Sequence, residues 1–454
     1  MSWRPRIKVG SGSKFMGLVE AIEEDVCASL ITSGERMPSQ RAVAAALGID
    51  LTTVTRAFNE AKLRGILVAQ QGRAGTRVAG GGPQAAWRTL TKPVDLSLNL
   101  PSQPARADLA GRISRSVADA LKGGSALLQY NEPKGSLVDR LAGANWLNDF
   151  MEHVEVETVV VASGAQASLH AIFSRVLNRG DRIGLGAVTY PGAIASARHI
   201  GATIVPLEMD REGLVPSSVE EAAKQGGLRA LYVVPTADNP TTATMSESRR
   251  REIARVARRY DICIVEDDPY RRLVSEAPRA IASICPERTF HIATLSKCAT
   301  PGLRIAYVVA PSASEAQALG EILRCTSLMA SPLMAALATR WIGEGTLSRV
   351  IDDVRLESVE REHMAQKILT GMTVSSEPGA HHVWLDLPAT WTPEKFVTAA
   401  GSLGIGLSPA AAFGTGTSVP NSVRVGIGAS ALRSDLRAAL VRLRDMVGTD
   451  KSTS

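Results

Sequence analysis

Reactive side chains follow two apolar runs in the second half of the chain. The motif EDDPY (266–270) comes after the run 262–265, and Lys297 comes after the run 290–295, with Arg304 seven residues further on. A lysine amine can form a Schiff base with an aldehyde, and an arginine can clamp a phosphate with paired hydrogen bonds. An acidic group at a strand end can hold a proton on a ring nitrogen, but it could equally bind a metal or cap a helix.

The motif SGAQ (163–166) is a third candidate, placed between the apolar run 159–162 and a helical pattern. A turn of small residues leading into a helix presents N–H groups and a favourable dipole to a phosphate. Each of these motifs alone is commonly structural. Their order along the chain is what makes them specific.

Apolar runs rich in β-branched residues alternate with alanine-rich helical patterns from about Val94 onward. The alternation predicts an α/β fold with a mostly parallel sheet that is covered on both faces. Ligands of such sheets bind beyond the carboxyl ends of the strands, where the candidate residues fall. The expected strands are 159–161, 183–185, 203–205, 231–234 and 262–265.

Taken in order, the motifs resemble those of the fold-type-I aminotransferases from about Val94 to Arg442. The resemblance implies a large pyridoxal-phosphate-dependent transferase-like domain with a smaller C-terminal α+β lobe. It rests on YNEPKG (130–135), SGAQ (163–166), TYPG (189–192), DNPT (238–241), EDDPY (266–270), SK (296–297) and VRVG (423–426).

The resemblance also implies roles for single residues. Lys297 would carry pyridoxal 5′-phosphate (PLP) as a Schiff base, and Asp267 would pair with the pyridinium nitrogen so that the ring acts as an electron sink. Tyr270 and Asn239 would bind the ring hydroxyl oxygen, and Tyr190 would stack on the ring. The phosphate would be held by Ala165, Gln166, Ser296 and Arg304.

Two further residues complete the implied site. Tyr130 would reach the phosphate of the neighbouring subunit of a homodimer, and Arg424 would bind the α-carboxylate of an amino acid. The family's Asn-Pro-Thr-Gly motif has Thr242 in place of its glycine. Because a β-branched residue resists positive φ, either the turn after Asn239 differs or this position does not need positive φ.

The N-terminal eighty residues form a separate pattern. Leu18, Ile22, Val26 and Leu30 recur every four residues and predict one helix. Ser39 and Gly48 bound a second expected helix as N-cap and C-terminal glycine. A third helix from Leu51 to about Arg64 and two strands at 66–68 and 76–78 complete the outline of a winged helix-turn-helix.

This stretch resembles the GntR-type winged helix through PSQR (38–41), Thr53-Val54 and GTRV (75–78). The resemblance implies that the third helix enters a major groove of double-stranded DNA. Many members begin that helix with a basic residue, and here Leu51 takes its place, which puts that base contact in doubt. The candidate DNA-binding residues are Arg36, Ser39, Arg41, Thr52, Thr53, Arg56 and Arg73.

The length of 454 residues predicts more than one domain. We place a DNA-binding domain at 1–79, a linker at 80–93 and a PLP-binding domain at 94–454. Residues 1–80 hold eleven basic and seven acidic residues, so they supply +4 of the net charge of +6, which suggests a nucleic-acid-binding end.

No apolar run is long enough for a membrane span, and the N-terminus lacks the features of a secretory signal. Five cysteines without a CxxC pair favour the reducing cytoplasm. His381 and His382 lack a third ligand at suitable spacing, so no metal is expected. The arginines of 249–259 are interpreted as a solvated helix face, with DNA wrapping as the alternative.

A GntR-type winged helix fused to an aminotransferase-like domain is the arrangement of the MocR subfamily of bacterial regulators. It implies a dimeric transcriptional regulator that binds PLP through Lys297 and senses PLP, an amino acid, or both. The alternative is an active PLP-dependent aminotransferase with an accessory DNA-binding domain, since Asp267, Tyr270 and Arg424 are also what transamination needs. A regulator without cofactor is disfavoured because Lys297 and Asp267 remain.

Overall fold

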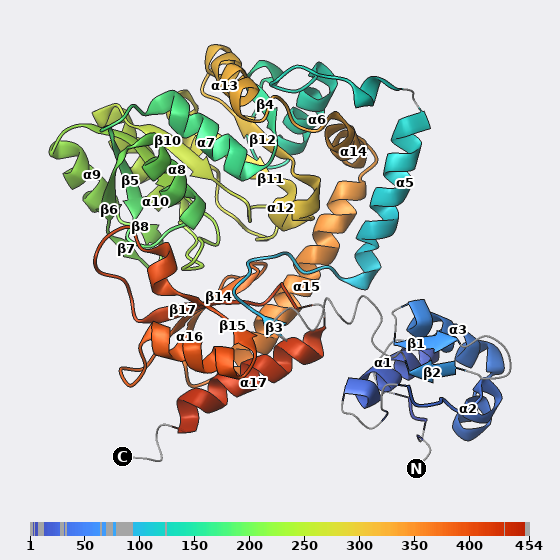
Figure 1. Cartoon of the computed structure of the whole chain (residues 1–454). Coiled ribbons are helices and arrows are strands. Elements are labelled where there is room, and N and C mark those ends of the chain that lie inside the picture. The colour runs from blue at the N-terminus through green and yellow to red at the C-terminus, as the bar shows by residue number, and fades with distance from the viewer. Residues whose placement is uncertain are drawn as a thin grey trace. The chain divides into compact units, whose positions relative to one another are not determined.

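The chain divides into two compact units, Met1–Pro93 and Val94–Ser454. Figure 1 shows the computed structural model with its helices and strands. The structure describes residues 3, 5–7, 13–27, 31, 34–63, 66–69, 76–78, 94–122, 125–430 and 432–449.

In the residues that the structure describes, the first unit is a winged helix-turn-helix with three helices. Its core packs apolar residues of all three helices, such as Leu18, Val43 and Phe58. The Ser39 side chain caps α2 by accepting a hydrogen bond from the Ala42 amide. The elements are α1 (Lys14–Cys27), α2 (Gln40–Leu47), α3 (Leu51–Leu63), β1 (Leu67–Ala69) and β2 (Thr76–Val78).

The second unit is built on a seven-stranded sheet with the order β4-β12-β11-β10-β9-β5-β6. Only β12 runs antiparallel to its neighbours, so the predicted mostly parallel sheet is confirmed. The strands are β4 (Val159–Ala162), β5 (Arg182–Gly186), β6 (Thr203–Leu207), β9 (Leu228–Val233), β10 (Cys263–Asp267), β11 (Thr289–Thr294) and β12 (Ala306–Val309).

Helices cover both faces of this sheet, as its apolar runs require. In β4, Val159 and Val161 pack into one core cluster while Val160 and Ala162 pack into another on the opposite face. The helices are α5 (Leu109–Lys122), α6 (Leu137–Leu147), α7 (Ala165–Val176), α8 (Pro191–Ile200), α9 (Pro216–Lys224), α10 (Glu247–Tyr260), α11 (Ile281–Ile284), α12 (Leu295–Cys298), α13 (Ala313–Thr326) and α14 (Pro332–Gly343).

A smaller C-terminal lobe holds a four-stranded sheet, β13-β14-β17-β16, with helices packed on it. The long helix α15 packs along α17 in this lobe (Figure 1). The α+β lobe that the resemblance implied is therefore present. Its elements are β13 (Thr373–Ser375), β14 (His382–Asp386), β16 (Ser408–Pro409), β17 (Ser422–Gly426), α15 (Thr346–Ile368), α16 (Pro393–Ser402) and α17 (Arg433–Thr449).

Short elements complete the described part of the second unit. Two pairs of strands form small separate sheets, β15 with β3 and β7 with β8. They are β3 (Val94–Asp95), β7 (Met209–Asp210), β8 (Gly213–Leu214) and β15 (Ile405–Gly406), and the 3₁₀ turns are η1 (Ala105–Ala107), η2 (Ser125–Leu128), η3 (Val156–Thr158), η4 (Pro286–Arg288), η5 (Pro301–Leu303) and η6 (Ala410–Phe413).

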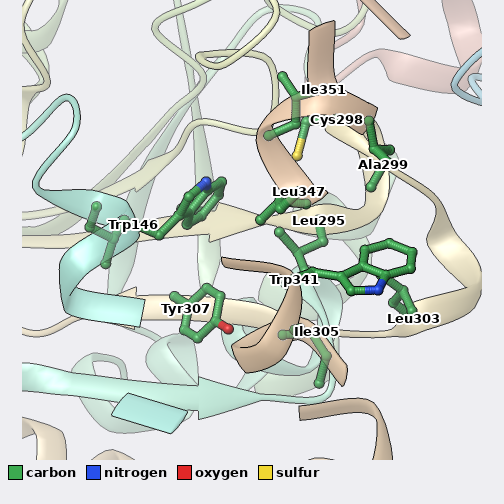
Figure 2. Close-up of a cluster of buried hydrophobic side chains, with 14 of the residues drawn as sticks. Trp146, Leu295, Cys298, Ala299, Leu303, Ile305, Tyr307, Trp341, Leu347 and Ile351 are labelled. Carbon is green, nitrogen blue, oxygen red and sulfur yellow. The ribbon is translucent and has the colours of Figure 1, made fainter. Parts of the chain in front are cut away.

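A buried apolar cluster anchors the short segment that carries Lys297. Leu295 and Cys298 flank this lysine in α12, and both are buried in one apolar cluster that also holds Trp341, Leu347 and Ile351 (Figure 2). Burial raises the pKa of the Cys298 thiol to about 12, so this residue is a packing residue. The cluster fixes the backbone from which the Lys297 side chain projects.

The arginine-rich helix α10 has its cationic side chains paired within the second unit. Arg250 is buried and donates to backbone carbonyls, including that of Pro235. The expected solvated face therefore holds for the exposed Arg251, Arg255, Arg258 and Arg259 but not for Arg250. The other pairs are Arg249–Asp210, Arg251–Glu247, Arg255–Glu220, Arg258–Glu287 and Arg259–Glu220. Among the residues described, no helix is long and apolar enough to cross a lipid bilayer.

Candidate functional site

A cavity of about 410 Å³ lies beyond the carboxyl ends of the central strands. Its lining includes ten of the eleven residues expected around the cofactor and its amino-acid ligand, and only Tyr130 is missing. They are Ala165, Gln166, Tyr190, Asn239, Asp267, Tyr270, Ser296, Lys297, Arg304 and Arg424. Sequence positions more than 250 residues apart therefore meet in one pocket.

The Lys297 side chain points into this pocket from α12. Its Nζ donates a hydrogen bond to the backbone oxygen of Asn99. Burial, with Arg424 adding repulsion, lowers the pKa of Lys297 to about 8. A lowered pKa leaves part of the amine neutral near physiological pH, which is the form that attacks an aldehyde.

His381 and His382 support the pocket through backbone carbonyls. His381 Nε2 lies 2.7 Å from the Lys297 oxygen, and His382 Nε2 lies 3.1 Å from the Asp238 oxygen. Burial lowers the pKa of both rings, so both are neutral at pH 7. Each histidine therefore holds the backbone of, or next to, a pocket residue.

Asp267 is the last residue of β10 and is fully buried. Tyr232, on the adjacent strand β9, donates a hydrogen bond of 2.9 Å to Asp267 Oδ2. Its Oδ1 atom is buried and has no hydrogen-bond partner among the described residues. Burial raises the pKa of Asp267 to about 6. The carboxylate therefore offers one free acceptor oxygen at the pocket.

Arg424 enters the pocket from β17. Its Nη1 donates to Asn239 Oδ1 over 2.8 Å, and its Nη2 donates to the Ser97 oxygen over 2.5 Å. The guanidinium carbon lies 4.8 Å from the centre of the Phe413 ring. Arg424 Nε is buried and unpartnered within the described residues, so this group can still bind an anion.

Arg304 and the N-terminus of α7 meet at the other end of the pocket. Arg304 Nη2 donates to the Ser163 oxygen over 3.2 Å. Gly164 caps α7 at φ +88°, and a Cβ built there would lie 2.8 Å from Arg304 Nη2. The helix N-terminus and the guanidinium together form a cradle for a phosphate.

The Gln166 side chain differs from the expected arrangement. Its amide nitrogen donates to the Gly192 oxygen over 3.1 Å and to Ser196 Oγ over 3.0 Å, so it braces α8. Its backbone N–H remains in the first turn of α7, where N–H groups lack intrahelical partners. Ser296 keeps its side chain in the cradle region, where Thr294 Oγ1 donates to its hydroxyl over 3.0 Å.

Thr242 adopts a positive φ of +65° and is buried. The sequence left open whether the position of Thr242 needs positive φ. The structure shows positive φ there, so the alternative without it is wrong. Thr242 donates its N–H to the Asp238 oxygen over 2.7 Å, which closes the turn around Asn239. The turn after Asn239 therefore holds a β-branched residue in the left-handed region.

Tyr130 lies outside the pocket of its own chain and is 84 % exposed. Apolar side chains near it in sequence are also exposed: Leu128 by 67 %, Leu137 by 50 %, Val138 by 65 % and Leu141 by 45 %. Exposed apolar residues gathered in one segment are a feature of many interaction surfaces.

The first unit presents most of the expected DNA-binding residues. Arg36, Arg41 and Thr52 are exposed, as is Leu51 at the start of α3. Thr53 is half-buried. The Arg56 guanidinium lies 4.6 Å from the ring centre of Phe15 on α1, and Ser39 is occupied as the cap of α2. Arg73 lies outside the described residues.

Three residues that line the pocket, Tyr232, Asn99 and Phe413, belong to none of the motifs found in the sequence. Tyr232 had a signal, since it is the only hydroxyl-bearing residue of the apolar run 231–234. Asn99 and Phe413 had none: Asn99 lies in a segment between elements, Phe413 ends the short 3₁₀ turn η6, and both reach the pocket only through the fold.

Comparison with known proteins agrees with both units. The family aminotransferase class I and II matches residues 91–443, and the family of bacterial regulatory proteins, gntR, matches residues 17–78. The HTH-type transcriptional regulator YdeF of Bacillus subtilis is 28 % identical over 98 % of this chain and 97 % of its own length.

Known aminotransferases resemble the second unit in sequence and in fold. An aromatic-amino-acid aminotransferase of Thermococcus litoralis is 27 % identical over 70 % of this chain and 79 % of its own length. The structure of LysN, an α-aminoadipate aminotransferase of Thermus thermophilus, superposes with a TM-score of 0.73 at 23 % identity, over 81 % and 95 % of the two chains. The chain therefore belongs to the aminotransferase class I and II family and, with its gntR-family helix-turn-helix, has the architecture of the MocR-type transcriptional regulators.

Proposed function

We propose that this protein is a DNA-binding transcriptional regulator that holds PLP on Lys297 and responds to PLP, an amino acid, or both. The observation that carries the proposal is the meeting of Lys297, Asp267 and Arg304 in one cavity. That cavity lies in a chain whose first unit is a gntR-family helix-turn-helix.

The pocket fits PLP by the chemistry of its donors and acceptors. The unpartnered Asp267 Oδ1 suits a pyridinium N–H, and the cradle of Arg304 and α7 suits a phosphate. The volume lies in the range of roughly 300–1,000 Å³ that is typical of ligand pockets. When bound, PLP supplies an electron sink conjugated to the amine it carries.

The residues of this chain have separable roles in the proposed site. Lys297 would bind the aldehyde carbon covalently, and Asp267 would keep the proton on the ring nitrogen. Tyr270 and Asn239 would donate to the ring oxygen, and Tyr190 would cover one face of the ring. Asp267 is buried and Lys297 is half-buried in the cavity wall, which would limit the access of water to the bond between lysine and cofactor.

Arg424 is the proposed anchor for the carboxylate of an amino-acid effector. Asn239 and the Ser97 carbonyl hold two of its nitrogens in place, and Phe413 supports the guanidinium plane. A guanidinium fixed in this way binds a carboxylate with little loss of conformational entropy. Arg424→Leu is expected to remove the amino-acid response and to keep PLP binding.

We assign the DNA-binding domain to 1–79, a linker to 80–93 and the PLP-binding domain to 94–454. The exposed apolar segment that contains Tyr130 supports a homodimer, because a second copy of the chain would cover it. In such a dimer Tyr130 would reach the partner's phosphate site. Operator DNA would contact the exposed side chains of α2 and α3 and the wing.

The covalent step is tested by titrating PLP into the full chain and reducing the complex with borohydride. We expect an absorbance band of a lysine-bound aldehyde and a mass increase on the peptide that contains Lys297. Lys297→Ala should lose the mass label and the band. A label on a different lysine, with Lys297 unmodified, would overturn the assignment.

The alternative function is an aminotransferase with an accessory DNA-binding domain. It is favoured by the intact set of Lys297, Asp267, Tyr270 and Arg424. Sustained turnover of an amino acid with a keto acid, on the order of 1–1,000 per second, would favour this alternative. A single conversion of bound PLP without turnover supports the regulator.

A further inference from the structure

Asn99 contacts both the Lys297 amine and the Tyr270 hydroxyl, although it belongs to none of the motifs found in the sequence. Its backbone oxygen accepts a hydrogen bond from Lys297 Nζ, and its Nδ2 donates to the Tyr270 hydroxyl over 2.6 Å. Its Oδ1 atom is buried and has no partner in the part of the chain that the structure describes. The side chain thus lines the cavity with one atom engaged and one free.

The segment that carries Asn99 is held firmly by its neighbours. The Ser97 oxygen accepts from Arg424 Nη2, and Ser97 itself donates to Asp95 through its amide over 3.0 Å. The Gly426 amide donates to the Leu96 oxygen over 2.7 Å. A Cβ at Gly426 would collide with the Leu98 oxygen, so strand β17 and this segment are in close backbone contact. Asn99 is therefore placed by a rigid frame.

We propose that Asn99 is a positioning residue that holds the Tyr270 hydroxyl and the Lys297 amine in a fixed relation and so sets the acid–base behaviour of the pair. The proposal rests on the proposed PLP site but concerns groups of the chain itself.

The chemistry of an amide explains why asparagine suits this place. An amide N–H that donates to the phenol oxygen leaves the phenol proton free to point into the pocket, where it can be donated onward. The amide is neutral at every pH, so it adds no charge beside the buried Lys297. An isosteric aspartate could not donate to Tyr270, and its negative charge would favour the protonated lysine.

The first test uses the apo full-length chain and needs no cofactor. The rate at which an amine-reactive reagent modifies Lys297, followed by mass spectrometry, is measured against pH. Asn99→Asp is expected to move the midpoint of this profile upward by about one pH unit or more. Gln225→Glu, which adds a charge at an exposed site outside the cavity, should leave the midpoint unchanged. An unchanged midpoint in Asn99→Asp would overturn the proposal.

The second test is a double-mutant cycle on the PLP-loaded protein. The readout is the pH at which the absorbance of bound PLP changes. Asn99→Ala is expected to raise this pH, because Tyr270 becomes a weaker donor to the ring oxygen. In a Tyr270→Phe background, Asn99→Ala should have little further effect, since its partner is gone. Equal shifts in both backgrounds would show that Asn99 does not act through Tyr270.

The two tests separate this proposal from the proposed function. If PLP does not bind to Lys297, the proposed function fails, while the apo profile still decides whether Asn99 controls the lysine. If PLP binds and neither profile responds to Asn99, the proposed function stands and the positioning role fails.

Discussion

Burial determines the chemistry of single residues in this pocket. Lys297 and Asp267 have no direct counter-ion in the described residues, and desolvation is the first cause of both pKa shifts. A lysine with a lowered pKa and a carboxyl with a raised pKa are each disfavoured in their charged forms in the apo protein. In the proposed site, PLP would relieve this cost, because it would consume the lysine charge and give Asp267 a cationic partner.

Lys297→Met is expected to stabilise the apo protein. The folded pKa of about 8 lies below the unfolded value of 10.5, so the unfolded state binds more protons between these values and stability rises with pH in this window. Below pH 8 the cost of the buried charge is present in full and amounts to about 3 kcal/mol. Urea unfolding at pH 7 should show a gain of up to this size.

The gain in Lys297→Met should shrink between pH 8 and pH 10. Lys395→Met, at an exposed position on α16, should change stability little at either pH. If Lys297→Met is less stable than wild type at pH 7, the lysine charge does not destabilise the apo protein.

At the residue scale, motif order was sufficient to find the lining of the pocket but not the contacts within it. Ten expected residues line the cavity, yet Gln166 turns its side chain to α8. Tyr232 was missed although it is the only hydroxyl-bearing residue of the apolar run 231–234, and Asn99 was missed because a hydrogen bond from a connecting segment leaves no local pattern. A sequence motif reports residue type and spacing, whereas rotamer and partner depend on the packed fold.

At the scale of secondary structure, two elements form the proposed phosphate cradle: the N-terminus of α7 and the η5 turn that precedes Arg304. The small turn after β4 lets α7 begin beside Arg304, and Gly164 leaves the space that the guanidinium occupies. The helix and strand pattern predicted this turn. It could not predict that Arg304 crosses it, because η5 places that arginine through contacts distant in sequence.

Gly164→Ala is expected to weaken PLP binding by about tenfold or more, since its Cβ would displace Arg304. Gly180→Ala is the matched control: Gly180 has φ +90°, and no atom lies within 4 Å of the position that a Cβ would take there. Both variants place a side chain on a residue with positive φ, which costs on the order of 1–3 kcal/mol in backbone strain. Only Gly164→Ala should lower the affinity for PLP in an absorbance titration, and equal affinities would argue against the cradle.

The whole molecule joins a small winged helix to a large ligand-binding unit. The sequence predicted both folds because their apolar periods differ and because a stretch rich in glycine separates them. It could not predict the exposed apolar segment near Tyr130, since exposure depends on which faces of α6 and η2 the rest of the fold covers.

Val138→Asp is expected to shift the protein from dimer to monomer, because a charge would enter the proposed interface. Leu403→Asp is the control, at an exposed leucine outside this segment. Light scattering at micromolar concentration measures the mass of each variant. Since Tyr130 would serve the partner's site, the monomer should also bind PLP more weakly. A Val138→Asp dimer with wild-type affinity would place the interface elsewhere.

The proposed regulatory role is tested by measuring the affinity of the full chain for DNA upstream of its own and neighbouring genes. The affinity is measured with and without PLP. Random DNA serves as the reference at one fixed moderate salt concentration, because phosphate contacts dominate non-specific affinity. We predict selective binding that changes with PLP and changes less in Lys297→Ala. Binding without preference over random DNA under either condition would contradict the regulator and favour the aminotransferase.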